Sequence, residues 1–367
     1  MILNETNTNA KFTLDNATLE IVSKYKYLGI VITSKYVTNL FKGHFEYILN
    51  KAKTKAAAIR AFGFSKNGFR VKSSVRLYKL LVRPILEFCG QTLTYALYSQ
   101  PSRSCESSYY SKKLEHFQTQ VLKNLINCPR STSPSITRLF CGTEPIISRL
   151  EIMKLRYFWK TLHGPKDALT YKLLTYRKTR LLEFNKGFAK DIFNISSKYN
   201  AMNFWHGLAP SKLNRLLNPL QCIKRIIIAK NLRKDLETGR ARKCSFAKIY
   251  LKNEFLYQKI YHIVEPFNQA NCFPSPEGRY RFIKALLHPC SYTSECPLCR
   301  QQHKDTCEHF LTSCSQTVEA KRRLLLKLKL YNYPDSAPLK KTEILKLTLG
   351  NTVWRKCLTD FLIETSF

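Results

Sequence analysis

The chain has 367 residues, and its 61 Lys and Arg against 25 Asp and Glu give a formal net charge of +36 at pH 7. An excess of this size disfavours a generic cytosolic enzyme and favours a polyanionic partner, with nucleic acid as the default. The chain has no run of about 18 apolar residues, and its polar start, MILNETNTNAK, does not fit a signal peptide. We therefore expect an intracellular protein of the nucleus or cytoplasm with no membrane partner.

The rest of the composition bounds the fold. Apolar residues make up 44% and aromatic residues 12%, which is enough for buried cores, while only 12 Gly and 15 Pro favour a mainly α chain. Length alone favours two or three domains. Without a secretory signal, the 13 cysteines are expected to be reduced thiols, a few of them metal ligands, and not a disulfide framework.

The first predicted elements are β-strands. Residues 11–14 and 18–22 alternate apolar and polar side chains around an Asp-Asn pair, which predicts a hairpin. Residues 25–33 form a β-branched and aromatic run that predicts one further strand. Gly29 interrupts this run, at a place where backbone or a ligand could approach closely.

From residue 40 the apolar period changes to three or four residues, which predicts an amphipathic helix with a basic back. Its apolar positions are Phe41, Phe45, Ile48, Ala52, Ala56 and Ile59. Residues 63–68 (GFSKNG) break this helix, and a second one begins at Val71. Pro84 lacks a donor and crowds the preceding turn, so we expect this second helix to kink or restart near Arg83.

Further helices follow a Ser-rich stretch, 98–111, that we expect to be a connector. Apolar periodicity predicts a third helix over 114–125 and a fourth over 147–157. Two more helices are predicted over 320–330 and 342–364, near the end of the chain.

The segment CPLCRQQHKDTCEHFLTSC contains Cys296-x2-Cys299-x9-His309-x4-Cys314. Two cysteines separated by two residues can bind one ion, because the short turn brings both sulfurs within about 2.3 Å of it. EHFLTSC spaces its His and Cys as a helical turn would. Four such ligands leave no open coordination position, so we predict a structural zinc and not a Lewis-acid catalyst.

The choice of ligands stays open at this point. His303, Cys307 or Cys290 could replace one of the four in a different loop geometry, and His288 lies nearby. The alternative to a metal site is a chance cluster among the 13 cysteines. We favour His309 and Cys314, because their spacing is that of known zinc knuckles.

Lys and Arg concentrate in residues 155–190 and 224–243. Such clusters can neutralise phosphates, and nearby aromatic side chains can stack on unpaired bases. The alternative for any single cluster is a solvated helix face. The residues predicted here to contact nucleic acid are Arg177, Lys178, Arg180, Arg240, Arg242 and Lys243.

No catalytic residue is predicted. The seven aspartates are all separated in sequence, and the chain has neither a GxxxxGK[ST] loop nor an HExxH pair. Two-metal phosphoryl transfer needs clustered carboxylates that hold two ions about 4 Å apart. Local sequence supplies no such cluster.

Several segments in order resemble the reverse transcriptases of non-LTR (LINE-type) retrotransposons, downstream of the catalytic palm. YKYLGIVI (25–32) looks like the strand motif that follows the palm centre. HFEYILNKAKTKAAAIRAFG (44–63) and VRLYKLLVRPILEFCG (75–90) are similar to the thumb. The thumb phrase Y…RP-x-L-x-Y/F-x-G is matched at Tyr78, Arg83, Pro84, Leu86, Phe88 and Gly90. Residues 114–146 resemble the next block, and the Cys-Cys-His-Cys spacing matches the C-terminal knuckle.

The resemblance implies a mainly α chain with four parts. They are a β palm remnant over 1–36, a helical thumb over 37–110, a basic helical region over 111–270, and a zinc knuckle with C-terminal helices over 271–367. The thumb would grip an RNA–DNA duplex, and the knuckle would hold template RNA or target DNA. The candidate thumb contacts are Lys51, Lys55, Arg60, Lys72 and Arg76.

The sequence departs from the family at one decisive place. The F/Y-x-D-D pair that binds catalytic magnesium, the fingers and the endonuclease domain have no counterpart here, so magnesium would belong only to a full-length enzyme. The leading hypothesis is a fragment of a retrotransposon RNA-directed DNA polymerase that retains RNA and DNA binding. The alternative is a host-recruited, zinc-containing scaffold that binds protein and has no nucleic-acid role.

Overall fold

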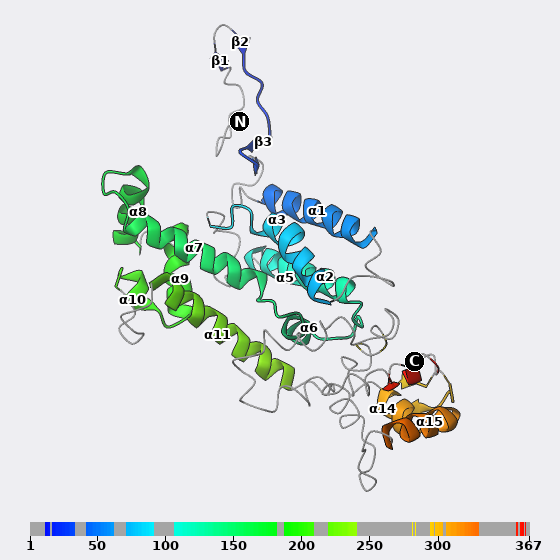
Figure 1. The fold of residues 1–367 in the computed structure, drawn as a ribbon. Coiled ribbons are helices and arrows are strands. Elements are labelled where there is room, and N and C mark those ends of the chain that lie inside the picture. The colour runs from blue at the N-terminus through cyan, green and yellow to red at the C-terminus, as the bar shows by residue number, and fades with distance from the viewer. Residues whose placement is uncertain are drawn as a thin grey trace. The chain divides into compact units, whose positions relative to one another are not determined.

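The structure is a computed structural model that is mainly helical with a few short strands, as the sequence predicts (Figure 1). It describes residues 12–14, 17–33, 42–61, 71–91, 106–181, 187–208, 219–240, 281, 283, 294–296, 298–303, 306–329, 357–358, 360–362 and 364. In this described part, no helix combines the length and the apolar character needed to cross a bilayer.

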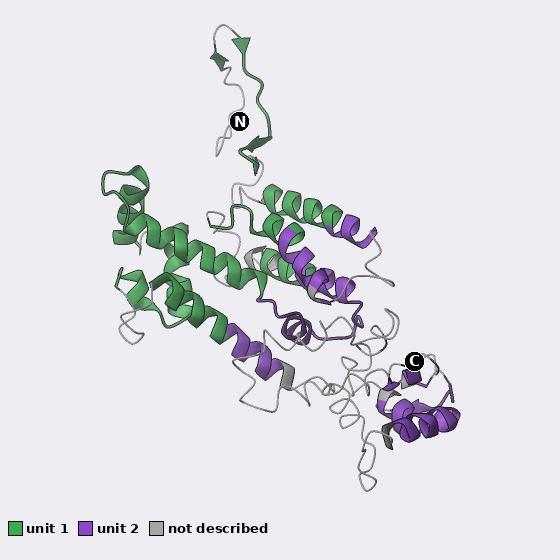
Figure 2. Ribbon diagram, in the orientation of Figure 1, with its two compact units in different colours: residues 1–55, 81–117, 145–230 green, residues 56–80, 118–144, 231–367 purple. Residues whose placement is uncertain are grey.

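The chain forms two compact units, each assembled from three separate stretches (Figure 2). Unit 1 comprises Met1–Lys55, Leu81–Phe117 and Pro145–Lys230. Unit 2 comprises Ala56–Leu80, Gln118–Glu144 and Asn231–Phe367.

The predicted N-terminal hairpin is confirmed, although it is shorter than the sequence suggests. β1 (Thr13–Leu14) and β2 (Ala17–Thr18) are antiparallel, with Thr13 opposite Thr18. The N–H of Leu19 also donates to the carbonyl oxygen of Phe12 at 2.7 Å.

The single strand predicted over 25–33 is wrong, because this segment folds back on itself. β3 (Lys24–Tyr27) and β4 (Ile30–Thr33) form a second antiparallel hairpin. The two residues between them, Leu28 and Gly29, have φ angles of 46° and 88°. Two positive φ angles are what a two-residue type I′ turn requires, so Gly29 marks the turn of a hairpin.

α1 (Lys42–Ile59) is the predicted amphipathic helix. Its buried side chains include Phe45, Ile48, Ala52 and Ile59. Its exposed side chains include Lys51, Lys53 and Lys55. The helix start packs on β4, where the N–H of Val31 donates to Nδ1 of the fully buried His44 at 3.3 Å. Burial lowers the pKa of His44, which is consistent with a neutral ring that accepts this hydrogen bond.

The predicted kink or restart near Arg83 is confirmed. α2 (Val71–Leu77) passes into a π-helical turn, η2 (Tyr78–Val82), and α3 (Arg83–Glu87) then begins with Pro84 in its first turn. Proline has no N–H to donate to the preceding turn, and the wider π turn accommodates that loss.

α5 (Glu106–Ile126) starts inside the stretch expected to be a connector, so the Ser-rich segment does not prevent helix formation. α6 (Pro134–Cys141) was not predicted. The hydroxyl of Ser133 caps it by accepting from the N–H of Ile136 at 3.3 Å, and Gly142 ends it with a φ of 56°. Serine before proline at the start and glycine after the end are the usual helix boundary signals.

One hydrophobic cluster of unit 1 is built by five helices, which lie together in Figure 1. They are α7 (Ile146–Leu162), α8 (Leu169–Thr179), α9 (Phe188–Lys198), α10 (Met202–Trp205) and α11 (Pro219–Arg240), the last through its N-terminal half.

Aromatic side chains fill this core. The ring of Phe158 stacks on Trp205 with centroids 5.7 Å apart, and Trp159 stacks on Phe204 at 4.7 Å. Such pairs are worth about 0.5–1.5 kcal/mol each beyond the area they bury. The aromatic packing thereby fixes the relative positions of α7 and α10.

In unit 2, residues 294–329 form a small module. β5 (Ser294–Glu295) and β6 (Gln302–His303) are antiparallel and are followed by α14 (Thr306–Thr312), the 3-10 turn η6 (Ser315–Thr317) and α15 (Val318–Lys329). α15 confirms the helix predicted over 320–330. The helix predicted over 342–364 lies mostly outside the described residues.

Candidate metal centre and basic surfaces

The β5–β6 hairpin positions the two cysteines of the CPLC segment. The N–H of Cys296 donates to the carbonyl oxygen of Gln301 at 2.9 Å, and the N–H of Arg300 donates to the carbonyl oxygen of Cys296 at 2.8 Å. Arg300 adopts a left-handed conformation, with a φ of 57°. This tight turn brings Cys299 back beside Cys296.

The other two predicted ligands come from α14 and the residue that follows it closely. His309 lies on α14, and the N–H of Cys314 donates to the carbonyl oxygen of His309 at 2.8 Å. The helical turn therefore holds the His309 ring and the Cys314 thiol on the same side of the module, as the spacing of EHFLTSC predicts.

The structure brings the ligand atoms of all four predicted residues together. The three sulfurs and the ring nitrogen of His309 all lie within 4.8 Å of one another. Sγ of Cys296 lies 3.9 Å from Sγ of Cys314, and Sγ of Cys299 lies 3.2 Å from Nε2 of His309. Four donor atoms this close can hold one metal ion.

The protonation equilibria of these groups are shifted by their surroundings. Burial would raise the pKa of the Cys296 thiol, but hydrogen bonds with the backbone of Cys299 and Leu298 and with the thiols of Cys299 and Cys314 together outweigh burial and lower this pKa. Burial, with the neighbouring thiols, raises the pKa of Cys314. Burial and the nearby His303 lower the pKa of His309, which favours the neutral imidazole that a metal ligand must be.

A second contact orients the His309 ring. Its Nδ1 lies 3.1 Å from the hydroxyl oxygen of Ser313, and that hydroxyl donates to the carbonyl oxygen of His309 at 3.4 Å. The serine oxygen is thus the acceptor for Nδ1–H, which leaves the lone pair of Nε2 facing Cys299. Metal-bound histidines are commonly fixed in this way through their second nitrogen.

The alternative ligands fare differently. His303 is not part of the four-atom cluster, and its ring stacks on His309 with centroids 3.4 Å apart. The side chain of Cys307 and the whole of Cys290 and His288 lie outside the described residues. Among the groups that the structure describes, the geometry therefore favours the original set.

Buried apolar side chains pack close to the four candidate ligands. Phe310 and Leu311 of α14 are buried, and Phe310 meets Phe361 edge-on with centroids 6.1 Å apart. The ammonium of Lys321 on α15 donates to the carbonyl oxygen of Cys314 at 3.0 Å. The module thus has a small core, and one ion at the four ligand atoms would join its hairpin to its helices.

The predicted basic contacts on α1 and α2 are only partly described. Lys51 and Lys55 lie one helical turn apart on α1 and are both exposed, as are Arg60 and Arg76. The side chain of Lys72 lies outside the described residues. Lys51 and Lys55 therefore form a basic strip on one exposed face of α1.

The predicted contacts near α8 and α11 differ in exposure. Arg177 and Arg180 are exposed, whereas Lys178 is half-buried with its ammonium 5.2 Å from the centroid of the Trp205 ring. Burial lowers the pKa of Lys178. The side chain of Arg240, together with Arg242 and Lys243, lies outside the described residues.

A cluster of paired charges in unit 1 was missed by sequence reasoning. Nζ of Lys154 lies 3.2 Å from Oδ2 of Asp191, and both side chains are buried. Glu151 accepts from the Lys198 ammonium at 2.5 Å and from the Tyr199 hydroxyl at 2.6 Å. Burial lowers the pKa of Lys154 to about 8, although Asp191 counteracts it. The partners in each of these pairs are far apart in sequence, so no local motif could have predicted the pairs.

Two of the motifs that carry the family resemblance contact each other. The backbone of Gly29 lies against the ring of Phe88, so that a Cβ added to the glycine would be 2.9 Å from Cζ. A Cβ added to Gly90 would be 2.3 Å from Cδ2 of the buried Leu150. The glycines of YLG and of the RP-x-L-x-F-x-G phrase thus have packing roles in unit 1.

We compared the chain with known protein families, with curated proteins and with solved structures, and none of them matches it. The features of the chain that bear on its function are therefore the cluster of metal ligands, the exposed cations and the sequence motifs.

Proposed function

We propose that the chain binds RNA and DNA through basic helical surfaces, and that a structural zinc ion holds its C-terminal module together. In this proposal it corresponds to the part of a non-LTR reverse transcriptase that lies downstream of the catalytic palm. It acts by binding and positioning nucleic acid, and no residue of this chain is assigned a catalytic role.

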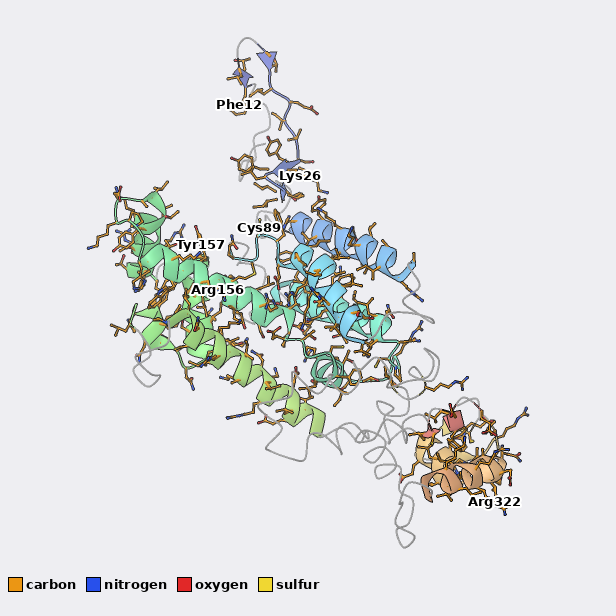
Figure 3. The ribbon with its side chains drawn as sticks, viewed as in Figure 1. Phe12, Lys26, Cys89, Arg156, Tyr157 and Arg322 are labelled. Carbon is orange, nitrogen blue, oxygen red and sulfur yellow. The ribbon has the colours of Figure 1, made fainter. Side chains whose placement is uncertain are left out.

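The observation that carries the proposal is the net charge of +36. Where side chains are described, many of the cations are exposed along helices, as on α1 and on α15, where Arg322 is labelled in Figure 3. Self-repulsion among so many cations destabilises a compact chain unless polyanions neutralise it. Nucleic-acid phosphates provide this neutralisation and release their condensed counterions on binding.

The donor set favours zinc among metal ions. Thiolate and imidazole ligands select soft or borderline ions, and a tetrahedral site of this composition is typical of structural zinc. With Zn–S distances of about 2.3 Å, two sulfurs in a tetrahedral site are about 3.8 Å apart. The 3.9 Å between Cys296 and Cys314 fits this value.

The basic strip of α1 suggests how a duplex would be held. Lys51 and Lys55 lie on one exposed face, and the opposite face packs into the core. Flexible ammonium groups on a rigid helix can follow a phosphate backbone without reading its sequence. We therefore expect binding that depends more on charge and shape than on base sequence.

A co-purification experiment tests the proposal. The tagged chain is isolated from cells with and without nuclease treatment, and the recovered nucleic acid and proteins are measured. The proposal predicts that RNA or DNA co-purifies and that nuclease removes it together with most protein partners. Partners that persist after nuclease digestion, with no recovered nucleic acid, would instead favour the scaffold alternative.

A further inference from the structure

A cavity of about 460 Å³ opens among α7, α8 and the start of α9, entirely within unit 1. Tyr157, which is labelled on α7 in Figure 3, lines it together with Leu173 of α8 and Phe188 of α9. Its volume lies in the range of sites that take a small organic ligand, about 300–1,000 Å³.

The apolar lining of this cavity is suited to a flat ligand. The rings of Tyr157 and Phe188 meet edge-on, with centroids 5.6 Å apart and planes at 86°. Leu173 is 53% exposed although it is apolar and lines the cavity. An aromatic ligand placed here would cover this leucine and contact the faces or edges of both rings.

The charge at the same cavity favours an anion. Arg177 and Lys190 both line it, and none of the described residues in its lining is acidic. Asp191 follows Lys190 in sequence, but it is buried and paired with Lys154 at 3.2 Å. That carboxylate is thus engaged by Lys154 of α7.

The start of α9 adds to this preference. Gly187 precedes the helix with a φ of 110° and has no side chain that could cap it, and the one acidic residue of the first turn, Asp191, is paired with Lys154. Phe188 and Lys190 belong to that turn and line the cavity. A helix N-terminus carries a partial positive charge, so it would reinforce Arg177 and Lys190 in holding a phosphate.

We propose that this cavity takes one unstacked nucleotide of a single-stranded nucleic acid. The base lies against Tyr157, Leu173 and Phe188, and its phosphate lies between Arg177, Lys190 and the start of α9. This inference rests on the proposed nucleic-acid binding. It adds a specific site for one base, whereas binding through charge alone would need no such site.

The first test compares two ligands that differ only in their bases. Fluorescence anisotropy measures binding of a short oligothymidine and of an abasic oligomer with the same number of phosphates. Stacking of one base predicts that the oligothymidine binds at least about 5-fold more tightly. Equal affinities for both oligomers overturn the cavity proposal and leave nucleic-acid binding intact. Failure to bind either oligomer at low salt overturns both.

The second test places a charge in the cavity. Leu173→Glu puts a carboxylate among the lining residues, and Leu169→Glu makes the same charge change one turn earlier on α8, at a side chain that is 71% exposed and does not line the cavity. We expect Leu173→Glu to abolish the preference for oligothymidine and Leu169→Glu to keep it. Both wild-type leucines are exposed, so both variants should fold, and circular dichroism verifies this. A Leu173→Glu protein that keeps the preference contradicts the proposal.

Discussion

The candidate ligand atoms of Cys296, Cys299, His309 and Cys314 lie within 4.8 Å of one another. Each of these residues therefore needs the other three to complete one metal site. Their grouping was predictable from sequence, because the turn at Cys296–Cys299 and the helical turn at His309–Cys314 are both local. The contacts that Ser313 and His303 make with the His309 ring could not be predicted, because neither residue belongs to a recognisable ligand spacing.

The metal site predicts a specific loss. We expect one zinc per wild-type chain, and Cys299→Ser to lose both the ion and the protection of residues 294–329, because structural zinc binding is largely folding free energy. Elemental analysis and hydrogen exchange measure the two effects. Cys89→Ser is the matched control, since this thiol lies in unit 1 outside the cluster. Zinc-free wild-type protein after reduced purification would contradict the site.

The buried Lys154 predicts a pH dependence. Its pKa is lowered by burial from 10.5 to about 8, so between these values the unfolded chain binds more protons than the folded one. Its contribution to stability is therefore fully present above about pH 10.5 and is lost as the pH falls through about 8. The difference is about 3 kcal/mol, at about 1.4 kcal/mol per pKa unit.

Lys154→Met removes this titration. We expect the difference in unfolding free energy between wild type and variant to grow as the pH rises from 8 to 10, in favour of the wild type. Denaturant unfolding at each pH provides the comparison. The pH dependence that comes from all other titrating groups is the same in both proteins and cancels in the difference. A difference that stays flat over this range would show that Lys154 is not held in the buried pair with Asp191.

At the scale of elements, apolar periodicity predicted α1, and the chemistry of Pro84 predicted the helix restart near Arg83. The β3–β4 hairpin was missed because Leu28 precedes Gly29 in its turn, and leucine is not a residue expected at positive φ. α6 was missed although Ser133, Pro134 and Gly142 mark its ends. With only eight residues, α6 is too short for a helical repeat of apolar residues to be recognised.

The turn at Gly29 gives a prediction for unit 1. Gly29→Ala is expected to destabilise it by about 1–3 kcal/mol, because φ is 88° and the new Cβ would lie 2.9 Å from the Phe88 ring. Thermal unfolding measures the loss. Phe88→Ala in the same chain should reduce the additional cost of Gly29→Ala, since it removes the clash and leaves the backbone strain. Fully additive losses would mean that the two residues do not meet.

The basic strip of α1 predicts a change in salt dependence. Lys51→Gln with Lys55→Gln should reduce the slope of log K against log salt by up to about 1.8, since each duplex phosphate that a lysine no longer neutralises lowers the slope by roughly 0.9. Thr54→Gln on the same helix is the control, because it changes an exposed polar side chain without changing charge. An unchanged slope in the double variant would remove α1 from the binding surface.

At the scale of the whole molecule, composition predicted a mainly helical chain and length predicted two or three domains, while the assembly of each unit from three separate stretches could not be foreseen. Each unit combines stretches that are distant in sequence, and the cavity beside Tyr157 is lined from three helices. Neither feature has a local signature. The net charge, in contrast, is a property of the sequence alone and makes the most general prediction.

The most direct measurement is the affinity of the folded, zinc-loaded chain for an oligonucleotide across a salt titration. We predict tight binding in dilute buffer, with log K falling linearly against log salt by roughly 0.7 to 0.9 for each phosphate neutralised. A folded protein that does not bind at low salt, or whose affinity is the same at low and high salt, would contradict nucleic-acid binding as its function.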